Sequence, residues 1–451
     1  MSGLTPHSSP KYLPPRTLSS PLLDKELSPA RREVPARRTL ETIFEEAAAR
    51  PSPPNHIKKT TPAPDPGPKR RPAPEGEGYQ GTKRARILND KLGEYIRSHS
   101  NLFLESEWDE VVRTIRKRGD LEVQPGEGDI PHPALGLLKS FQRTGVPVVL
   151  STAPWGAKKR RGHVQRGAHQ SCKDHLEFIR TEMLDFVKKG YWMVLPYRLV
   201  QDLAQLRLSP LGVVPQRERR PRLIVDYTYN GVNEDTVKMV PPEAMQFGRA
   251  LERVLYAVHH ANPHHGPVYI AKTDLADGFY RVPLSTSGIP KLGVILPRFP
   301  NEEQLVAFPL VLPMGWVESP PAFCAATETV ADLANNLSLR DDLPKHPLEE
   351  VANTNPKIDP NSVQSDPPQN RSATDDSPPR PVLRPFRRPV ALHDIYMDDF
   401  ISLIQGSSPR RQRHMRRLLH FIDRVFRPLD AYDSPERQHV ASIKKFQKGD
   451  G

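Results

Sequence analysis

The sequence predicts an α+β fold in which an antiparallel sheet is backed by helices. Apolar residues on both sides of Tyr396–Asp399 are typical of a β-hairpin whose tip carries two adjacent carboxylates. A short apolar strand over 268–271 leads to a third carboxylate, Asp274. Apolar residues recur at helical spacing over 323–337 and again over 415–426. This spacing predicts two helices that cover the sheet.

The composition indicates that a sizeable part of the chain does not pack into a core. Pro accounts for 51 of 451 residues, and only 37% of the residues are hydrophobic. The net charge of +12 favours a polyanionic partner. Two cysteines exclude a disulfide framework and indicate a reducing compartment. Without an apolar run of 18 residues or a signal peptide, we expect an intracellular protein with no membrane partner.

The first part of the chain divides at residue 88. Residues 1–88 are rich in Pro, Ser, Arg and Ala, and we expect them to be disordered. Basic clusters within 69–86 have the pattern of a bipartite nuclear-import signal, so the location is cytoplasmic or nuclear; a charged linker fits them equally well. Residues 89–170 predict small helices followed by irregular segments.

Residues 171–265 predict a helix followed by paired strands. The helix would run from Asp174, which forms a capping box with Glu177, to Gly190. The segments 213–214 and 223–225 would be the paired strands. Four histidines over 259–265 flank a turn without a Cys or carboxylate nearby, which argues against a metal site there.

Residues 340–386 separate the two halves of the predicted sheet. They are polar, rich in Pro and acidic in the middle, and we expect a disordered surface loop. Residues 387–451 then supply the hairpin and a helix that begins at Ser408. The arginines of this helix are expected to face outward: Arg410, Arg411, Arg413, Arg416 and Arg417.

The three carboxylates indicate a site for divalent cations. Adjacent aspartates repel each other and resist shared burial, so Asp398 and Asp399 need a cation unless they form a solvated turn. Hard oxygen ligands without His or Cys fit Mg²⁺. Two such ions suit nucleotidyl transfer, in which one activates a 3′-hydroxyl and both stabilise the displacement at phosphorus.

Four blocks, in this order along the chain, resemble those of reverse transcriptases of the retroviral and LTR-retrotransposon kind, which are RNA-directed DNA polymerases. The blocks are 220–227 (RPRLIVDY), 274–284 (DLADGFYRVPL), 312–323 (LPMGWVESPPAF) and 396–399 (YMDD). The resemblance implies a right-hand polymerase fold. Its fingers would span 171–265, and its palm would span 266–339 and 387–451.

The resemblance also implies a role for each site residue. Two Mg²⁺ ions, or Mn²⁺, would be held by Asp274, by the carbonyl of Leu275, and by Asp398 and Asp399. The dNTP would contact Arg222, Asp277, Gly278, Phe279, Met314 and Gly315. An RNA or DNA template-primer would contact Trp316, Ser319, Pro320, Tyr396 and Met397.

Two of these positions carry most of the specificity. Phe279 falls on the steric-gate position, where an aromatic ring fills the space that a ribose 2′-hydroxyl needs, so deoxynucleotides are expected. Arg222 matches the basic residue that clamps the triphosphate, although a solvated strand-end charge is the alternative. A second clamp residue would be Arg217, Arg219 or Arg220. Met314 departs from the retroviral pattern, which often has Gln there.

No thumb follows the predicted palm within the sequence. The chain is therefore expected to be a truncated fragment of a larger protein, with weak or no activity alone. One alternative is a non-catalytic nucleic-acid-binding relic of a retroelement. A less favoured alternative is an RNA-dependent RNA polymerase, against which Phe279 argues.

Overall fold

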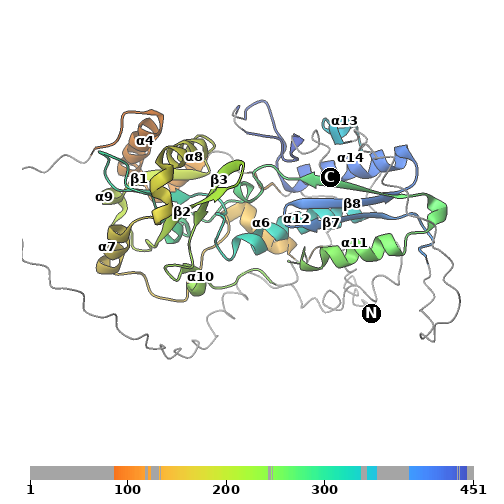
Figure 1. The fold of residues 1–451 in the computed structure, drawn as a ribbon, viewed down its shortest axis with the longest axis horizontal. Coiled ribbons are helices and arrows are strands. Elements are labelled where there is room, and N and C mark those ends of the chain that lie inside the picture. The colour runs from red at the N-terminus through yellow and green to blue at the C-terminus, as the bar shows by residue number, and fades with distance from the viewer. Residues whose placement is uncertain are drawn as a thin grey trace, which may run out of the picture.

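The computed structural model describes residues 86–443, with gaps at 117–119, 123–131, 133, 242–244, 246, 337–342, 353–384, 434 and 436. The fold is α+β and contains two sheets that lie side by side along the long axis of the molecule (Figure 1). The antiparallel sheet backed by helices is present as predicted. The predicted disorder of 1–85, and of 353–384, lies outside the described residues.

The N-terminal part of the described chain is helical. α4 (Lys91–Glu105) and α5 (Trp108–Arg116) precede α6 (Leu135–Thr144) and α7 (Ala157–Arg166). α4 begins at Asp90, whose carboxylate accepts a 2.8 Å hydrogen bond from the backbone N–H of Gly93. No helix in the described part of the chain is long and apolar enough to cross a membrane.

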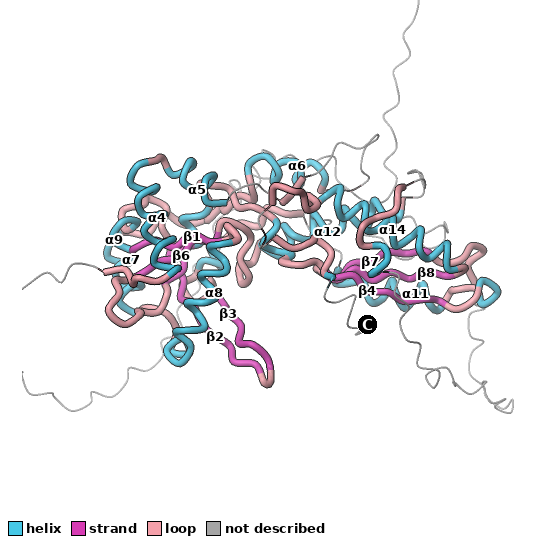
Figure 2. The backbone as a smooth tube through the Cα atoms, turned by 90° about the horizontal axis from the view of Figure 1, so that it is seen from above, coloured by secondary structure: helices cyan, strands magenta, loops and turns pink. Residues whose placement is uncertain are grey.

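The larger sheet has five strands in the order β1-β6-β5-β2-β3. Its interior is apolar, because every residue of β1, β5 and β6 is buried. The predicted strand pair is present, with Val213 opposite Leu223, and this hairpin projects from the sheet (Figure 2). The strands are β1 (Trp192–Pro196), β2 (Leu208–Gln216), β3 (Arg219–Val225), β5 (Gly293–Ile295) and β6 (Leu305–Pro309).

The helix that leads into this sheet starts later than predicted. Asp174 lies in a 3₁₀ turn, η1 (Gln170–His175), and α8 (Leu176–Lys188) begins after it without a side-chain cap. The predicted capping box is therefore wrong. Gly190 does end the helix region: its φ is +72°, and a Cβ there would lie 2.8 Å from the carbonyl oxygen of Ile115.

The smaller sheet has three antiparallel strands in the order β4-β8-β7. These are β4 (Val268–Asp274), β7 (Ala391–Tyr396) and β8 (Asp399–Gln405). α12 (Ser319–Asn335) and α14 (Ser408–Val425) join the main core on one face of this sheet, which includes Phe400 and Ile404. α11 (Ala250–His259) packs on the other face, against Leu392 and Leu403.

Short elements connect these units. The α-helical ones are α9 (Tyr197–Val200), α10 (Val232–Asp235) and α13 (Glu349–Ala352). The 3₁₀ turns are η3 (Phe247–Arg249), η4 (Pro263–His265), η5 (Gly278–Arg281) and η6 (Ile289–Leu292).

Part of the segment predicted to be a disordered loop is ordered. Residues 343–352 pack on α14, where Leu348 is buried with Leu419. Glu349 pairs with Arg416 of α14 at 2.8 Å. The polar residues of this segment therefore help to fix it to α14. Arg417, predicted to face outward, is only 2% exposed, because it lies on the buried face of α14. Both predictions are therefore wrong at these positions.

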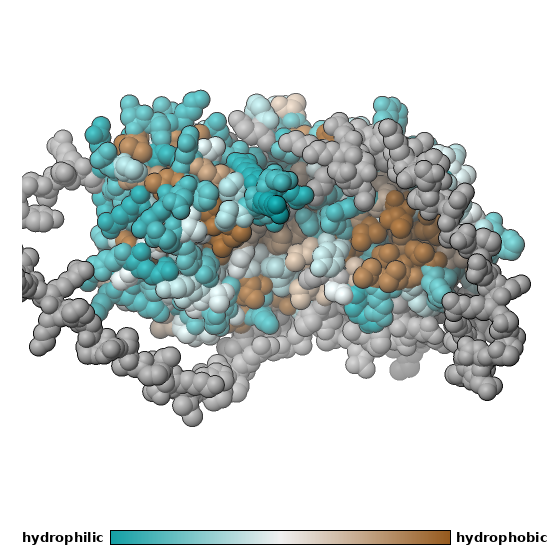
Figure 3. Space-filling model, in the orientation of Figure 1, coloured by the Kyte–Doolittle hydropathy of each residue, from teal (hydrophilic) through white to brown (hydrophobic). Residues whose placement is uncertain are grey.

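The apolar surface is unevenly distributed. Figure 3 shows hydrophobic surface gathered beside the three-stranded sheet, whereas the five-stranded part is mostly hydrophilic. Exposed apolar side chains of this region lie on α11 (Leu251, Leu255 and Val258) and on β4 (Ile270).

Candidate active site

The β7–β8 hairpin forms as the sequence predicts, and its tip is tight. Tyr396 pairs with Asp399, so only Met397 and Asp398 form the turn. Met397 has a φ of +59°, a left-handed conformation that costs a non-glycine residue about 1–2 kcal/mol. Two fully paired strands hold the residue there, and the hairpin therefore presents Asp398 and Asp399 in a fixed position.

Asp274 meets this tip from the neighbouring strand. β4 and β8 pair along their length, and the last pair of the ladder is Asp274 opposite Asp399. Directly opposed residues point to the same face of a sheet, with their Cβ atoms about 4.5–5.5 Å apart. Asp274 is 3% exposed. The structure thus brings together the carboxylates that the sequence singled out.

The two carboxylates of the hairpin tip, Asp398 and Asp399, have different electrostatic surroundings. The ammonium group of Lys272 lies 2.8 Å from Asp399 Oδ2. Lys272 reaches Asp399 because it lies on the same face of β4 as Asp274, two residues earlier. Burial, reinforced by the negative charge of Asp399, raises the pKa of Asp398 above its ordinary value. A cation at this tip would therefore relieve an unfavourable charge.

The donor atoms suit a hard cation, although the side chains are not gathered around one. Among the described residues, no group of three or more His, Cys, Asp or Glu is placed to hold a metal ion. Lys272 supplies the positive charge at Asp399 instead. Because all three carboxylates lie at the same end of the sheet and offer only oxygen ligands, the residues fit Mg²⁺ once Asp399 turns away from Lys272.

Hydrogen bonds to one side of the strand fix the backbone around Leu275. The N–H of Ala276 donates to Val440 at 2.8 Å, and the carbonyl of Asp274 accepts from Ser442 at 2.8 Å. Carbonyls of successive strand residues alternate between the two edges of the strand. The Leu275 carbonyl therefore faces the side of β4 on which β8 lies, away from residues 440–442.

The residues after Asp274 form a compact support. Asp277 has a φ of +56°, and its carboxylate accepts hydrogen bonds from Tyr191 at 3.1 Å and Lys189 at 3.4 Å. A Cβ on Gly278 would lie 3.0 Å from the ring of Phe323. Phe279 stacks on that ring with centroids 4.8 Å apart and is only partly buried. Stacking on Phe323 therefore limits the movement of the Phe279 ring, the predicted steric gate.

The loop before α12 is attached to the end of the five-stranded sheet. Asn233 donates to the carbonyl of Gly315 at 3.0 Å and accepts from the N–H of Val317 at 3.0 Å. Gly315 has a φ of +101°, and a Cβ there would lie 2.5 Å from the carbonyl oxygen of Val225. Met314 is 54% exposed at the tip of this loop. Both predicted dNTP contacts, Met314 and Gly315, are accessible.

Two predicted template contacts are buried. Trp316 is 1% exposed, and its indole N–H donates to Thr236 at 3.1 Å. Ser319 is also 1% exposed, and its hydroxyl donates to the carbonyl of Pro313 at 2.6 Å. Neither side chain can reach a template-primer, and the expected contacts are corrected to roles in supporting the loop. Pro320 is half-buried in the first turn of α12.

Arg222 lies apart from the carboxylates. It is exposed on β3, opposite Val214, in the five-stranded sheet. Of the other arginines weighed as clamp residues, Arg220 pairs with Glu182 of α8. Tyr396 is 53% exposed beside Asp399, where a primer terminus would have access. Met397 is half-buried in the turn.

Sequence reasoning missed Lys272 and two residues of a charged network described below, Asp120 and Arg281. The signal for Lys272 was present, because strand alternation places it on the face of Asp274. The histidines at 259–265 have neighbours within the protein: His260 stacks on Tyr256, and His265 contacts the carbonyl of Arg387.

Comparison with known proteins finds likenesses among solved structures. No protein-family model matches the chain, and no curated protein matches it. Among solved structures, the chain is similar to the foamy viral protease-reverse transcriptase dRH in complex with double-stranded DNA, with 13% identity and a TM-score of 0.35. The match covers 81% of this chain and 46% of that one, so it spans about half of that protein. At this level the likeness carries no argument about chemistry.

Proposed function

We propose that this chain is the fingers–palm part of an RNA-directed DNA polymerase of the retroviral and LTR-retrotransposon kind. In this proposal it transfers dNTPs onto the 3′-hydroxyl of a primer. The observation that carries the proposal is the register of the three-stranded sheet. It sets Asp274 opposite Asp399 at the tip of a hairpin that also presents Asp398. Three carboxylates at one end of a sheet, without His or Cys, are the kind of donor set that a two-metal nucleotidyl transferase uses.

The carboxylates and one backbone carbonyl would form the metal site. Asp274, Asp398 and Asp399 would hold two Mg²⁺ ions, with the Leu275 carbonyl completing the set. When bound, the ions supply activation of the 3′-hydroxyl and neutralise charge at phosphorus. Asp398, whose pKa burial raises, ionises more readily beside a cation. The protein's own contribution is therefore a rigid tip that fixes the carboxylates.

Nucleotide choice is assigned to the partly buried ring of Phe279. Its stacking on Phe323 limits how far it can move away from an incoming sugar. A ribose 2′-hydroxyl would meet this ring, whereas a deoxyribose would not. Accessible Met314 and Gly315 lie on the loop that would border the base.

A single-nucleotide extension assay tests the proposal. The full chain is used in excess over a labelled primer on RNA or DNA template, so that a weak grip does not hide the chemistry. Mg²⁺-dependent addition of dNTP is expected. Asp398→Asn should reduce it at least about 100-fold, the upper end of what even outer-shell metal partners contribute. Asp202→Asn, an exposed aspartate in a turn, is the matched control and should have no effect.

Two results would refute the assignment. Efficient use of NTPs would indicate an RNA-dependent RNA polymerase. Extension that Asp398→Asn leaves unchanged would remove the catalytic role.

A second candidate function, non-catalytic nucleic-acid binding, is favoured by one observation. Lys272 already neutralises Asp399, and the described residues hold no preformed group of three metal ligands. This candidate predicts that the chain binds primer-template equally well with and without Mg²⁺. It also predicts that Asp398→Asn leaves binding unchanged and that no extension occurs.

A further inference from the structure

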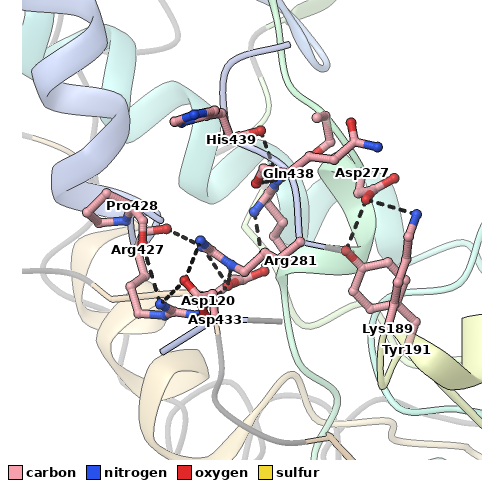
Figure 4. A network of polar contacts seen from close by, with 12 residues as sticks. Asp120, Lys189, Tyr191, Asp277, Arg281, Arg427, Pro428, Asp433, Gln438 and His439 are labelled. Carbon is pink, nitrogen blue, oxygen red and sulfur yellow. Dashed lines mark hydrogen bonds and ion pairs between the residues drawn. The ribbon is translucent and has the colours of Figure 1, made fainter. Parts of the chain in front are cut away.

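A network of charged side chains connects Asp120, Arg281, Arg427 and Asp433 (Figure 4). Its centre is Asp120, which is 9% exposed. Three arginines contact this one carboxylate: Arg281 at 3.3 Å, Arg427 at 3.4 Å and Arg437 at 2.8 Å. A buried carboxylate with three cationic partners is not explained by the polymerase chemistry above.

Arg281 connects the network to the metal-binding motif. It is 1% exposed, and its Nε donates to the carbonyl of Ala276 at 2.7 Å. Its Nη2 donates to the carbonyls of Gln438 at 3.1 Å and His439 at 3.2 Å. One guanidinium therefore joins the motif to a segment near the C-terminal end of the described chain.

That segment in turn holds the motif by its backbone. Val440 accepts a hydrogen bond from the N–H of Ala276, and Ser442 donates one to the carbonyl of Asp274, both at 2.8 Å. The peptide groups on both sides of Leu275 are thus fixed. Any displacement of Arg281 would loosen the Ala276 carbonyl and the segment that pairs with it.

The segment around Asp120 is itself anchored. The carbonyl of Asp120 accepts a hydrogen bond from the N–H of Arg427 at 2.7 Å, and Leu121 forms a β-bridge with Phe426. Asp433 binds Arg427 at 2.6 Å and Arg437 at 3.0 Å. The hydrogen bond from Arg427 lowers the pKa of Asp433 to about 2. Asp120 therefore sits on a fixed support.

We propose that Asp120 is a positioning residue for the metal-binding motif. Its carboxylate holds Arg281. Arg281 holds the Ala276 carbonyl and the segment whose backbone bonds Asp274 and Ala276. Removing the carboxylate would leave the buried guanidinium of Arg281 without its ion-pair partner, which is strongly destabilising. We expect Arg281 to shift toward water in response. The inference about the backbone stands on the contacts alone, whereas its consequence for metal binding rests on the proposed function.

Hydrogen exchange without metal tests the backbone step. Asp120→Asn keeps the shape of the side chain and removes its charge. We expect the amides of residues 274–278 to exchange at least about tenfold faster, with rates compared at equal overall stability in urea. Asp235→Asn is the matched control, because Asp235 pairs with another buried arginine, Arg207, at 2.9 Å beside the five-stranded sheet. It should leave exchange at 274–278 unchanged.

Two further variants keep the proposal falsifiable if Asp120→Asn folds poorly. Arg281→Lys keeps the charge but cannot bond Ala276, Gln438 and His439 together, so it should speed the same exchange. Asp120→Glu keeps the carboxylate and should restore slow exchange. Exchange that is unchanged in Asp120→Asn and Arg281→Lys, or raised equally by Asp235→Asn, would overturn the proposal.

Mn²⁺ binding, followed by the electron paramagnetic resonance signal of free Mn²⁺, gives the second readout. Asp120→Asn should weaken binding about 10–100-fold, as loss of an outer-shell partner does. Equal affinity in the wild type and Asp120→Asn would overturn the positioning role. A wild-type chain that binds no Mn²⁺ would instead refute the proposed function, and hydrogen exchange would still decide the role of Asp120.

Discussion

The two sheets of this molecule have different interiors. In the five-stranded sheet, β1, β5 and β6 are buried throughout and are built almost entirely from apolar residues. The three-stranded sheet buries polar and charged groups within its strands. These are Thr273, Asp274, His393, Asp394, Ser402 and Gln405. Burial of apolar surface stabilises a fold, whereas burial of charge costs stability unless the charge is paired.

The polar groups of the three-stranded sheet are largely held by specific partners. Asp394 pairs with Arg253 at 2.6 Å, and His393 contacts the hydroxyl of Ser402 at 2.8 Å. Buried pairs of this kind add little net stability, but breaking one is costly. The five-stranded sheet therefore stabilises the molecule, and the three-stranded sheet is organised to present Asp274 and the hairpin tip.

The largest expected effect is on the stability of the five-stranded sheet. Phe308 is fully buried in β6 and packs edge-on against Trp108. Phe308→Ala should lower the free energy of unfolding by about 3–5 kcal/mol, because it removes apolar contacts and leaves a cavity. Urea unfolding measures this. A loss below about 1 kcal/mol would contradict the stabilising role of this sheet.

At the hairpin tip, activity and stability should separate. Asp398→Asn is expected to reduce extension at least about 100-fold. Without metal, the same variant should be as stable as the wild type or more so, because burial and Asp399 disfavour the charge that it removes. Thermal unfolding in a chelator, alongside the extension assay, checks both. A destabilised Asp398→Asn would show that the tip is optimised for stability.

Acid should weaken the three-stranded sheet through His393. Burial, with the nearby charges of His414 and Arg417, lowers the pKa of His393 from 6.5 to about 3. The folded state therefore keeps His393 neutral, while the unfolded chain takes up a proton below pH 6.5. Stability should be full above that pH and fall toward pH 3, by up to about 1.4 kcal/mol per pH unit.

His393→Gln should lack this part of the pH dependence in urea unfolding. His99→Gln is the control, since burial lowers the pKa of His99 to about 4 near the five-stranded sheet. His99→Gln should remove a different part of the pH dependence of stability and leave the part due to His393 in place. A pH profile that His393→Gln leaves unchanged would show that His393 does not titrate as expected.

The smallest expected effect is at Lys272. Its ion pair with Asp399 is partly exposed, so Lys272→Met should change stability by less than about 1 kcal/mol. Mn²⁺ should bind about fivefold more tightly, since a competing charge worth about 1 kcal/mol in water is removed. Weaker binding in Lys272→Met would mean that the lysine supports the cation site.

Local pattern and long-range pairing explain what the sequence could predict. The hairpin at Tyr396–Asp399 follows from two apolar strands around a polar tip, which is local information. Pairing of Asp274 with Asp399 required the resemblance to a known family, because strand register between distant segments is set by the whole fold. The site roles assigned by that resemblance remain predictions.

The sequence could not predict which of these residues are buried or which charged groups pair. Trp316 lies within a recognisable block, but its burial depends on Thr236, 80 residues away. The partners of Asp120 lie 161, 307 and 317 residues from it, and no spacing rule connects them. The ordered segment 343–352 was missed because its composition is polar, while Leu348 and the ion pair of Glu349 with Arg416 anchor it.

The central claim is that carboxylates from separate strands form one cation site. Mn²⁺ titration by electron paramagnetic resonance tests it most directly. We predict that the wild type binds Mn²⁺, that Asp274→Asn and Asp399→Asn each weaken binding at least about tenfold, and that Asp202→Asn does not. Unchanged binding in Asp274→Asn would contradict the claim, because the strand opposite the hairpin would then contribute nothing to the site.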